Sequence, residues 1–415
     1  MLGWRVPRKL PPRQWCLHFL VMQNGLSASS PFTKWAGKTK LSTYSEIGPL
    51  LCSVCCNLCS SMLSFLCAAL MVLYVPLPPE DHFSEFELIP EEDNYQNPPT
   101  GNDQQQHAEW FEEQLEADLK WSFALNGVLH AATSEFQDIV LLDTKRFGKA
   151  LVIDGKLQSA ERDEFIYHEC LVHPALLLHD NPKTIFIMGG GEGSTARESL
   201  KHKDVEKVIM CDIDRMVVDF CREHLTENQE AFRDDKLHIV FNDAKDELEK
   251  TEEKFDVIVG DLPDPIEGGP CNDLYTKPFY EQVIKPHLKD NGIFVTQAGL
   301  AGILSHKDIF TSIYNTIKHV FKYVIAYTAH VPSYADSCGW VLASDEPLKL
   351  DVEQLNSRIQ ERIRGDLLYL DGASIVSSTV VNKMICTSLL KETQVLTGEN
   401  VRFVYGHGLT KNAEE

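Results

Sequence analysis

The sequence predicts an α/β protein: a doubly wound sheet of seven strands, preceded by a small antiparallel β domain. Two observations carry this prediction. From about residue 163 onward, short apolar runs alternate at first with helical stretches, a pattern typical of a largely parallel sheet with helices on both faces. Before that point, residues 121–160 hold short β-like runs separated by turn residues, as expected for an antiparallel unit.

The composition is that of a globular chain with an acidic surface. Of the 415 residues, 43% are apolar and 24% are charged, which excludes a wholly disordered or fibrous chain. Asp and Glu number 61 against 39 Lys and Arg, giving a formal net charge of −22. Such a surface repels phosphate backbones, so we expect no nucleic-acid partner. It is compatible with cationic ligands, although acidity is also a common solubility device.

Residues 1–107 are predicted to be an extension of the folded protein. Residues 1–79 are basic and hold a single acid, Glu46, whereas residues 80–415 carry a formal net charge of −28. The apolar segment 50–75 is long enough to cross about 30 Å of hydrocarbon. We keep open a membrane anchor, an organelle-targeting role, and an extension that a soluble protein carries without a membrane role, and we favour the last. Residues 76–107 are rich in Pro, Asn, Gln and acids, which predicts a disordered acidic linker.

The cysteines do not form a recognisable disulfide framework. The pattern Cys52-x-x-Cys55-Cys56-x-x-Cys59 has apolar surroundings and no second ligand pair, so a zinc site is disfavoured. The six cysteines after residue 107 are scattered, which indicates reduced thiols. We therefore expect a cytoplasmic protein without a membrane partner, with targeting by segment 50–75 left open.

Residues 108–165 are predicted to form the small β domain. Segment 110–121 is compatible with a short helix or with the entry of a strand. The runs that predict strands are 127–133, 136–143, 149–155 and 156–161. A unit of about 50 residues is too small to be very stable alone, so it should pack against a neighbouring domain or a partner subunit.

Residues 166–415 are predicted to form the larger domain, in which the sheet is completed by C-terminal helices. The apolar runs that predict its strands are 184–188, 207–211, 237–241, 256–259, 292–296, 323–328 and 340–343. The last two lie close together in the sequence and favour an antiparallel hairpin. Segment 351–400 has helical periodicity.

A glycine-rich loop follows the first strand of this domain, in the segment IFIMGGGEGSTARESLKH (185–202). Glycines such as Gly189 and Gly191 allow a sharp turn and a close approach of a ligand. The spacing Gly191-x-Gly193-x-x-Ala196 loosely satisfies a dinucleotide fingerprint, which dehydrogenases and S-adenosylmethionine enzymes share. The sheet is therefore predicted to be Rossmann-like, of the methyltransferase type.

Acidic side chains follow the next two strands and suggest an adenosine pocket. Asp212 lies 19 residues beyond Gly193, where a carboxylate can accept hydrogen bonds from both ribose hydroxyls. Asp243 and Ala244 end the third strand, within reach of an adenine edge. Each acid alone is equally compatible with a solvated strand end or a helix cap.

Glu192 indicates which kind of molecule this pocket holds. It lies inside the glycine-rich loop, where the non-adenosine part of a cofactor would pass. A carboxylate there repels a pyrophosphate and attracts an amine. The pattern therefore favours decarboxylated S-adenosylmethionine, whose tail ends in a primary amine, over a dinucleotide.

The fourth strand ends in a second acidic motif, GDLPDP. Asp261 and Asp264 are three residues apart at the carboxyl end of the sheet, the edge at which α/β sheets bind ligands. Such a pair suits a cationic substrate, and one member can take or orient the proton of an attacking amine. A polar turn with a helix cap is the simpler alternative.

From about residue 109 to residue 408 the chain resembles the polyamine-forming aminopropyltransferases, the spermidine and spermine synthase group. The motifs that carry the resemblance are SEFQDIVLLD, DGKLQSAERDEFIYHE, MGGGEGS, CDID, NDAKD, GDLPDP, LYTKPFYE and VPSYADSCGW. Within the group it is most similar to the plant thermospermine synthases, in the runs DLKWSFALN, LVIDGKLQSAERDEFIYHECL and GIFVTQAG.

The resemblance implies transfer of the aminopropyl group of decarboxylated S-adenosylmethionine to a terminal amine of spermidine, giving thermospermine and methylthioadenosine. It implies no further cofactor and no metal. Asp261 would accept the proton of the attacking amine, assisted by Tyr167. The residues implied to bind the donor are Gln137, Glu192, Asp212, Asp243 and Ala244, together with the loop glycines Gly189 and Gly191. The residues implied to line the acceptor site are Gln158, Tyr167, His168, Asp264 and Tyr334.

Three departures from the usual spermidine synthase pattern bear on the acceptor. Glu192 replaces Asp in GGGDGG, Leu262 and Pro263 replace the serines of DSSDP, and His168 stands where many plant and animal members have Gln. Loss of two serines removes hydroxyl donors and adds apolar surface, which suits a longer acceptor. Spermine synthesis, and spermidine synthesis from putrescine, remain alternatives.

Two other classes of protein are weighed against this one. A methyltransferase is disfavoured by Glu192, and a non-catalytic polyamine-binding protein is disfavoured because Asp261 and Asp264 are both present. The partners that we expect are a small polyamine, spermidine, and further copies of the chain in a homodimer or homotetramer that the small β domain helps to form.

Overall fold

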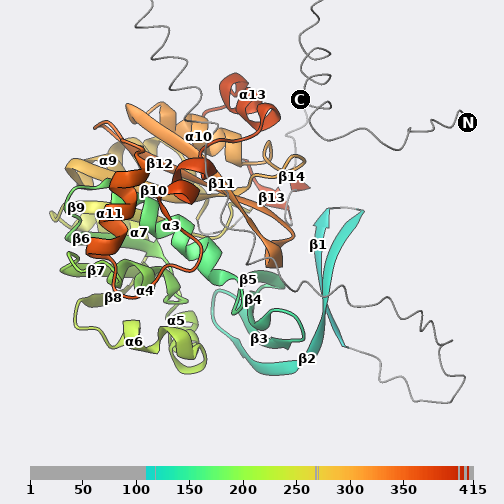
Figure 1. The fold of residues 1–415 in the computed structure, drawn as a ribbon. Coiled ribbons are helices and arrows are strands. Elements are labelled where there is room, and N and C mark those ends of the chain that lie inside the picture. Colours follow the sequence, from blue (N-terminus) through green and yellow to red (C-terminus); the bar gives the residue numbers. More distant parts are fainter. Residues whose placement is uncertain are drawn as a thin grey trace, which may run out of the picture. The chain divides into compact units, whose positions relative to one another are not determined.

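The computed structural model describes residues 109–116, 118–266, 269, 271–400, 402–405 and 409–410. All of them belong to one compact unit, Asn102–Glu415. It contains a five-stranded sheet, a seven-stranded sheet and a two-stranded ribbon near the C-terminus (Figure 1). Segment 50–75, the cysteine pattern 52–59 and the linker 76–107 lie outside the described residues.

The small sheet is an antiparallel meander in which each strand pairs with the next along the chain. Its strands are β1 (Trp110–Glu116), β2 (Leu119–Thr133), β3 (Asp138–Thr144), β4 (Gly148–Ile153) and β5 (Lys156–Ala160). From its sequence, segment 110–121 is compatible with a helix or a strand. In the structure it forms β1 and the start of β2, joined by a tight turn. The long strand β2 shifts register against β3 at two points, which lets it pair with both neighbours while bending.

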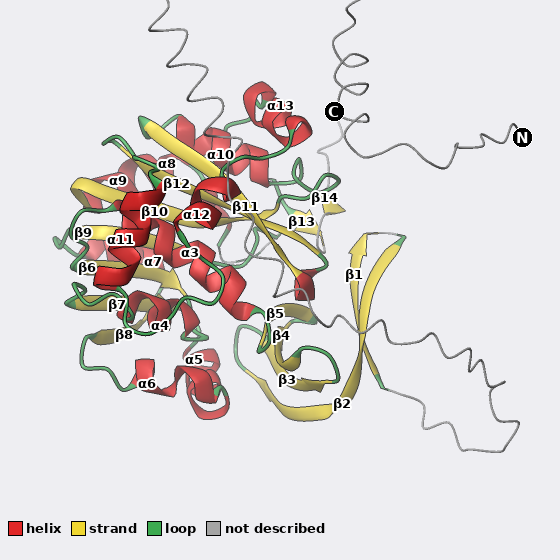
Figure 2. Ribbon diagram, in the orientation of Figure 1, coloured by secondary structure: helices red, strands yellow, loops and turns green. Residues whose placement is uncertain are grey.

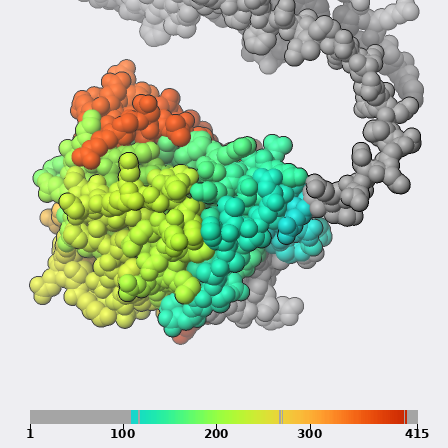
Figure 3. Space-filling view, turned by 90° about the horizontal axis from the view of Figure 1, so that it is seen from below, coloured from blue at the N-terminus to red at the C-terminus, as the bar shows by residue number. Residues whose placement is uncertain are grey.

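Alternating side chains give the small sheet two apolar faces. Leu142 and Val152 belong to a cluster with aromatic residues of β1 and β2. Ile139 and Leu141 point to the other face and pack against α5 (Arg215–His224), where they contact a cluster that includes Phe220. In Figure 3 the cyan-to-green surface of this sheet lies directly against the yellow-green surface of the following domain. The small sheet thus buries one face on its neighbour, as its size requires.

The seven-stranded sheet has the strand order β11-β12-β10-β9-β6-β7-β8. Its strands are β6 (Thr184–Gly189), β7 (Lys207–Asp212), β8 (Leu237–Phe241), β9 (Phe255–Asp261), β10 (Leu288–Leu300), β11 (Tyr323–Val331) and β12 (Asp336–Ser344). Neighbouring strands from β8 to β10 are parallel, whereas β12 runs antiparallel to both β10 and β11. All seven predicted strands are confirmed, and so is the antiparallel pairing of the last two.

Helices cover both faces of this sheet, as Figure 2 shows. Along β6, Phe186 and Met188 point into one apolar cluster while Ile185 and Ile187 point into the other. The first face is covered by α7 (Ala244–Lys250), η5 (Tyr280–Ile284), α10 (Phe310–Lys318) and α13 (Lys383–Lys391). The second is covered by α3 (Glu164–Leu178), α4 (Ser194–Leu200), α11 (Val352–Arg362) and α12 (Gly372–Ser378). The Rossmann-like fold class and the helices predicted within 351–400 are therefore confirmed.

Short helical segments complete the description. They are η3 (Thr226–Asn228), α6 (Gln229–Phe232), η4 (Asn272–Tyr275), α8 (Lys277–Phe279), α9 (Lys285–His287) and η6 (Pro332–Tyr334), and the C-terminal ribbon is β13 (Val404–Tyr405) with β14 (Leu409–Thr410). Both sheets lie in one unit, so the boundary expected near residue 165 marks a change of sheet; the segment limits themselves stay predictions. The cysteines with described positions are free thiols: Cys170, Cys211, Cys221, Cys271, Cys338 and Cys386.

No single helix within the described ranges is both long and apolar enough to cross a membrane. The helices α12 and α13 meet the length and composition test only when taken together, and they are bent by 58° relative to each other.

The packing of the small sheet on α5 can be tested with Leu141, whose side chain is 1% exposed. We expect Leu141→Ala to lower the free energy of unfolding by about 2–5 kcal/mol, because it leaves a cavity between the sheet and the helix. Urea denaturation followed by circular dichroism measures this loss. The control is Leu390→Ala, since Leu390 is 74% exposed and its removal should change stability by less than about 0.5 kcal/mol. Equal effects of the two substitutions would contradict the packing described here.

Candidate active site

The predicted residues gather where the parallel strands β6, β7, β8 and β9 end. The chain order reverses between β6 and β9, which are hydrogen-bonded neighbours in the sheet. At such a switch point the loops that follow the two strands diverge and leave space for a ligand. The glycine-rich loop leaves β6 here, and Asp261 is the last residue of β9.

The glycine-rich loop lies directly against the end of β9. Gly189 and Gly190 both have φ of +76°, a conformation that other residues rarely adopt. A Cβ atom on Gly189 would lie 2.3 Å from the backbone oxygen of Asp261, and the Gly190 amide donates a hydrogen bond of 3.2 Å to that oxygen. Glycine is therefore required here by the close approach of two backbones.

Asp212, at the end of β7, is held by backbone amides on both sides. It accepts hydrogen bonds from the amide of Gly191 at 2.9 Å and from that of Asp214 at 2.8 Å. Burial raises the pKa of Asp212 to about 6 despite these two donors. The carboxylate thus has a fixed orientation beside the loop, and a further hydroxyl donor would stabilise its charged form.

Asp243 ends the next loop and caps α7, accepting a hydrogen bond of 2.8 Å from the amide of Lys245. The helix cap, which the sequence left open as the simpler interpretation, is therefore present. Ala244 begins the helix and is buried. A capping role does not exclude contact with an adenine edge, so the predicted role of both residues stays a prediction.

Gln137 connects the small sheet to this edge. It precedes β3, and its side-chain amide donates a hydrogen bond of 3.0 Å to Asp214, the residue that caps α5. Ser134 donates to the same carboxylate oxygen. Residues of the β2–β3 turn therefore reach the end of β7, two residues from Asp212.

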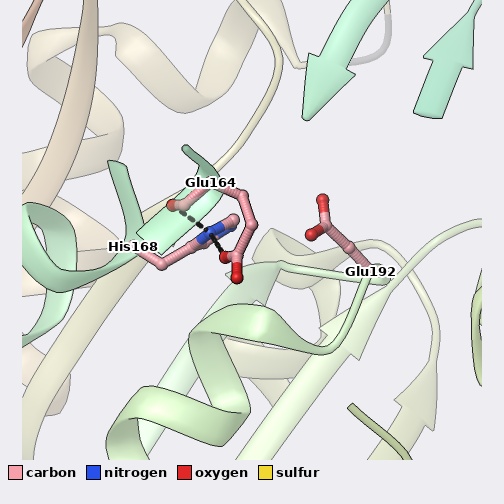
Figure 4. Close-up of side chains that lie close together, drawn as sticks. All are labelled: Glu164, His168 and Glu192. Atoms are coloured by element: carbon pink, nitrogen blue, oxygen red, sulfur yellow. Dashed lines mark hydrogen bonds and ion pairs between the residues drawn. The ribbon is translucent and has the colours of Figure 1, made fainter. Parts of the chain in front are cut away.

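Glu192 lies beside two side chains from α3, His168 and Glu164 (Figure 4). One side-chain atom of each residue lies within 4.8 Å of the other two. The His168 Nδ1–H donates to Glu164 Oε2 at 2.7 Å and to the Glu164 backbone oxygen at 2.9 Å. Glu192 itself accepts a hydrogen bond of 2.6 Å from Ser194.

Charge within this cluster is balanced by cations. Arg197 donates two hydrogen bonds, of 2.8 and 2.9 Å, to the two carboxylate oxygens of Glu164. Burial disfavours a charged His168, but the Glu164 hydrogen bond and the negative charges of Glu192, Glu164 and Asp261 raise the pKa of His168 to about 9. Burial also raises the pKa of Glu192, and His168 works against this rise. His168 is therefore a cation at neutral pH.

Three clustered ligand atoms are also compatible with a metal ion, but the hydrogen bonds favour a charge network. Both oxygens of Glu164 are bonded to Arg197, and the Nδ1 of His168 faces two acceptors, so it carries a hydrogen. Because the pKa of His168 is raised to about 9, its ring carries a hydrogen on both nitrogens at neutral pH and presents no lone pair to a metal. We therefore interpret Glu164, His168 and Arg197 as an ion-pair network beside Glu192.

Both oxygens of Asp261 accept hydrogen bonds from hydroxyl groups. Tyr167, from α3, donates to Oδ1 at 3.3 Å. Thr195, from the first turn of α4, donates to Oδ2 at 2.6 Å. Burial and the charge of Asp261 raise the pKa of Tyr167 well above its usual value, so this phenol remains a donor at any ordinary pH.

Tyr334 closes the site from the connection between β11 and β12. Its hydroxyl donates to the backbone oxygen of Gln158 in β5, and its ring lies 6.1 Å from that of Tyr167. The Ser333 amide donates a 2.7 Å hydrogen bond to Asp163, just before α3. Burial raises the pKa of Tyr334, and the charges of Glu192 and Asp261 add to this effect. Tyr334 therefore remains a protonated phenol beside Tyr167.

Asp264, the second acid of the GDLPDP motif, is held in place by a side chain of the neighbouring strand β10. The side-chain amide of Gln297, on β10, donates to Asp264 Oδ1 at 3.1 Å and to the backbone oxygen of Leu262 at 2.7 Å. Tyr275 donates to the backbone oxygen of Pro263 at 3.0 Å. Cys271 packs against the same loop, and burial raises the pKa of its thiol to about 12, which excludes it as a thiolate nucleophile.

Residues 164–352 match the spermine/spermidine synthase domain, and residues 109–161 match the spermidine synthase tetramerisation domain. Over 305 residues the chain is 66% identical to thermospermine synthase ACAULIS5 of Arabidopsis thaliana, covering 74% of this chain and 90% of that protein. The chain belongs to the spermine/spermidine synthase family.

The chain is also similar to an archaeal protein and to two solved structures. A polyamine aminopropyltransferase of Sulfurisphaera tokodaii is 45% identical over 280 residues, covering 67% of this chain and 92% of the relative. Spermidine synthase from Thermotoga maritima superposes with a TM-score of 0.62 at 27% identity, covering 69% of this chain and 96% of that one. A spermidine synthase in complex with the transition-state analogue AdoDATO superposes with a TM-score of 0.63 at 28% identity, covering 69% of this chain and 96% of that one.

Several side chains of the site were not foreseen. Glu164 could have been found, because it lies four residues before His168 on a helix, the spacing at which side chains meet. Thr195 could not, because Asp261 is brought to it only by the pairing of the non-consecutive strands β6 and β9. Gln297 could not either, because its contact with Asp264 depends on β10 pairing with β9 rather than on any local pattern.

Two hollows differ in their relation to the predicted residues. A small cavity is lined by Glu192 together with Ser159, Glu164, Ser194, Arg197 and Asn228, among others. A wider hollow between α10, α13 and Arg402 is lined by none of the predicted residues. The small cavity therefore marks the side of Glu192 that faces the small sheet.

The charge network predicts a specific titration. Glu164→Gln should lower the pKa of His168 from about 9, because it removes one acceptor charge while His168 stays buried and only Glu192 and Asp261 still favour the charged ring. Histidine ring resonances in a selectively labelled protein measure this pKa. Because the folded-state pKa exceeds the unfolded one, the stability that charged His168 contributes is full below pH 6.5 and is lost as pH rises to about 9.

Thermal unfolding between pH 6 and pH 9.5 should therefore depend less on pH in Glu164→Gln than in the wild type. Glu346→Gln serves as the control, since Glu346 is exposed and lines neither of the two hollows. A His168 that titrates near 6.5 in the wild type would exclude the network.

Proposed function

We propose that this enzyme is a thermospermine synthase: it transfers the aminopropyl group of decarboxylated S-adenosylmethionine to a terminal amine of spermidine. The observation that carries the proposal is a pair of carboxylates on either side of α3 residues: Glu192 in the glycine-rich loop has an oxygen within 4.8 Å of a His168 nitrogen, and Asp261 at the end of β9 accepts a hydrogen bond from Tyr167. The choice of product rests on the 66% identity to a thermospermine synthase.

The donor is proposed to bind along the ends of β6, β7 and β8. Asp212 would accept hydrogen bonds from the ribose hydroxyls. These bonds would offset the free-energy cost of keeping a charged carboxylate in a desolvated position. Asp243 and Ala244 would border the adenine, and Gly189 and Gly191 would allow the loop to approach the ligand. Gln137 would cover the nucleoside from the small sheet.

The amine of the donor is proposed to bind Glu192. Its carboxylate is half-buried next to the cation His168, so an incoming ammonium group must share this region with a positive charge. Glu164 contributes a second negative charge to the cluster. Arg197 pairs with Glu164, whereas Glu192 accepts its hydrogen bond from the neutral Ser194, so Glu192 is the carboxylate that a primary amine would pair with and that would repel the carboxylate of ordinary S-adenosylmethionine. This argues against a methyltransferase.

The acceptor is proposed to lie between Asp261 and Asp264. Gln158, Tyr167, His168, Asp264 and Tyr334 would line its path. Carboxylates and phenol hydroxyls can hold the ammonium groups of a polyamine, and Leu262 gives the loop an apolar surface for its methylene groups. Gln297 fixes Asp264 in position for this role.

The chemistry proposed is a direct displacement. A polyamine amine titrates near the value of a lysine side chain, about 10.4, so it reaches the enzyme protonated and must lose a proton before it attacks. Asp261 takes that proton, with Tyr167 donating to the same carboxylate. The nitrogen lone pair then forms a bond to the propyl carbon, and the carbon–sulfur electron pair leaves with the sulfur as methylthioadenosine. Alignment of nitrogen, carbon and sulfur contributes much of the rate.

We also propose that the enzyme needs no metal and that it is located in the cytoplasm. The sulfonium of the donor already makes its propyl carbon electrophilic, so no Lewis acid is needed. The similar proteins are named both polyamine aminopropyltransferase and spermidine synthase, so spermidine synthesis from putrescine and spermine synthesis from spermidine are the alternative outcomes.

The product decides between these activities. Full-length protein with decarboxylated S-adenosylmethionine and spermidine should release methylthioadenosine and form thermospermine, which chromatography separates from spermine of equal mass. Putrescine should be a poorer acceptor. Exhaustive treatment with EDTA should leave the rate unchanged. Formation of spermine, or a preference for putrescine, would replace the proposed product.

Asp261→Asn should lower kcat by about 10²–10⁴-fold, because it removes the proton acceptor, while the donor still binds. Isothermal titration with the donor measures the binding that should survive. Asp246→Asn is the matched control, since Asp246 is exposed on α7. Near-normal turnover of Asp261→Asn would remove Asp261 from the central role.

The protein is also proposed to be a homotetramer. Large apolar side chains are exposed on the first two strands and the following turn: Trp110, Leu119, Val128, Leu129 and Phe136. They lie in the segment that matches the tetramerisation domain. Exposed apolar side chains in such number indicate a surface that another chain covers.

We expect light scattering after size-exclusion chromatography to give the mass of four chains, with a homodimer as the alternative. Val128→Asp, at a side chain that is 53% exposed, should shift the protein to smaller species by placing a charge in the interface. Val380→Asp introduces the same charge at a side chain that is 79% exposed after α12 and should leave the mass unchanged. A wild-type monomer would contradict the proposal.

A further inference from the structure

The carboxylate at the end of β9 has one oxygen turned inward and one turned toward the site. Asp261 Oδ2 accepts a hydrogen bond of 2.6 Å from the hydroxyl of Thr195, a residue that is fully buried. Asp261 Oδ1 is 3.3 Å from the hydroxyl of Tyr167, which is one of the residues expected to line the acceptor site. The two oxygens are thus in different surroundings.

Thr195 is held in this position by the glycine-rich loop. The loop ends at Gly193, and Thr195 is the second residue of α4. A Cβ atom on Gly190 would lie 3.4 Å from Asp261 Oδ2 and 3.8 Å from the Cβ of Thr195. The loop thus passes at van der Waals distance from the hydroxyl–carboxylate contact, and glycine is needed at this position because a Cβ atom would approach Ile187 to 2.9 Å.

We propose that Thr195 is a positioning residue that engages Oδ2 of Asp261, so that Oδ1 is the oxygen that takes the proton of the acceptor amine. This inference rests on the proposed function, because it assigns a role within that reaction. A carboxylate bonded on one oxygen by a buried hydroxyl cannot rotate without breaking that bond. Its second oxygen therefore keeps a fixed direction toward the acceptor.

The contact survives the proton transfer. The acceptor ammonium gives its proton to Oδ1, and the freed nitrogen lone pair forms the bond to the propyl carbon as the carbon–sulfur pair departs with sulfur. Asp261 is then a neutral acid whose Oδ2 has carbonyl character and still accepts from Thr195. The proton later leaves to solvent. Thr195 thus stabilises both forms, and the charged form more strongly.

A matched pair of the same residue types lies at the opposite end of the same two strands. Thr184, the first residue of β6, donates a hydrogen bond of 3.0 Å to Asp256 Oδ2 at the start of β9. This contact is far along the strands from Asp261 and belongs to no predicted site. Thr184→Val therefore removes a comparable hydrogen bond without touching the reaction.

The test compares Thr195→Val, Thr195→Ser and Thr184→Val in the full-length protein with decarboxylated S-adenosylmethionine and spermidine. Thr195→Val should lower kcat by about 10- to 100-fold, the range for loss of a hydrogen bond to a charged group. The KM for the donor should stay within about twofold, and the acid limb of the pH–rate profile should move to higher pH, because the carboxylate loses a donor. Thr195→Ser retains the hydroxyl and should recover most of the rate.

Thermal unfolding is measured for all three variants. Thr184→Val should lose stability to a similar degree as Thr195→Val, yet keep the wild-type kcat and pH profile. An unchanged pH profile in Thr195→Val, or a Thr195→Ser variant as slow as Thr195→Val, overturns the positioning role. A wild-type protein that releases no methylthioadenosine overturns the proposed function itself, whereas an active wild type with an equally active Thr195→Val overturns this inference alone.

Discussion

The close contact between the glycine-rich loop and the end of β9 determines the geometry of the whole site. Because Gly189 and Gly190 lack side chains, the loop after β6 lies against the backbone of Asp261. This contact places the loop that is proposed to hold the donor beside the carboxylate that is proposed to act on the acceptor. Any side chain at Gly189 would separate the two, since its Cβ would overlap the Asp261 oxygen.

Around this contact the protein compensates buried negative charge with hydrogen bonds and with cations of its own. Asp212 is bonded to two backbone amides, Asp261 to two hydroxyls, and Glu164 to Arg197 and His168. These donors hold the carboxylates in position before any ligand arrives. A cationic ligand then meets a site whose negative charges need little rearrangement, which favours rapid and specific binding.

The sequence could predict the fold and the acidic residues because both are encoded locally. Apolar runs and turn residues mark each strand, and Asp212, Asp243 and Asp261 stand at strand ends that any parallel sheet brings to one edge. The order of strands and the inward contacts are different. Thr195 meets Asp261 across 66 residues of chain, and Gln297 meets Asp264 across 33. These pairs depend on which strands become neighbours, and hydrophobic periodicity does not contain that information.

The link between Tyr334 and Gln158 bears on how the protein is made. It joins residues 176 positions apart, one in the small sheet and one in the connection between β11 and β12. During synthesis the small sheet, α3 and the glycine-rich loop leave the ribosome long before β11 and β12. The acceptor side of the site is therefore the last part to be assembled, and a nascent or truncated chain that ends before residue 334 lacks it even when the donor side is complete. Such a fragment could bind the nucleoside and still transfer nothing.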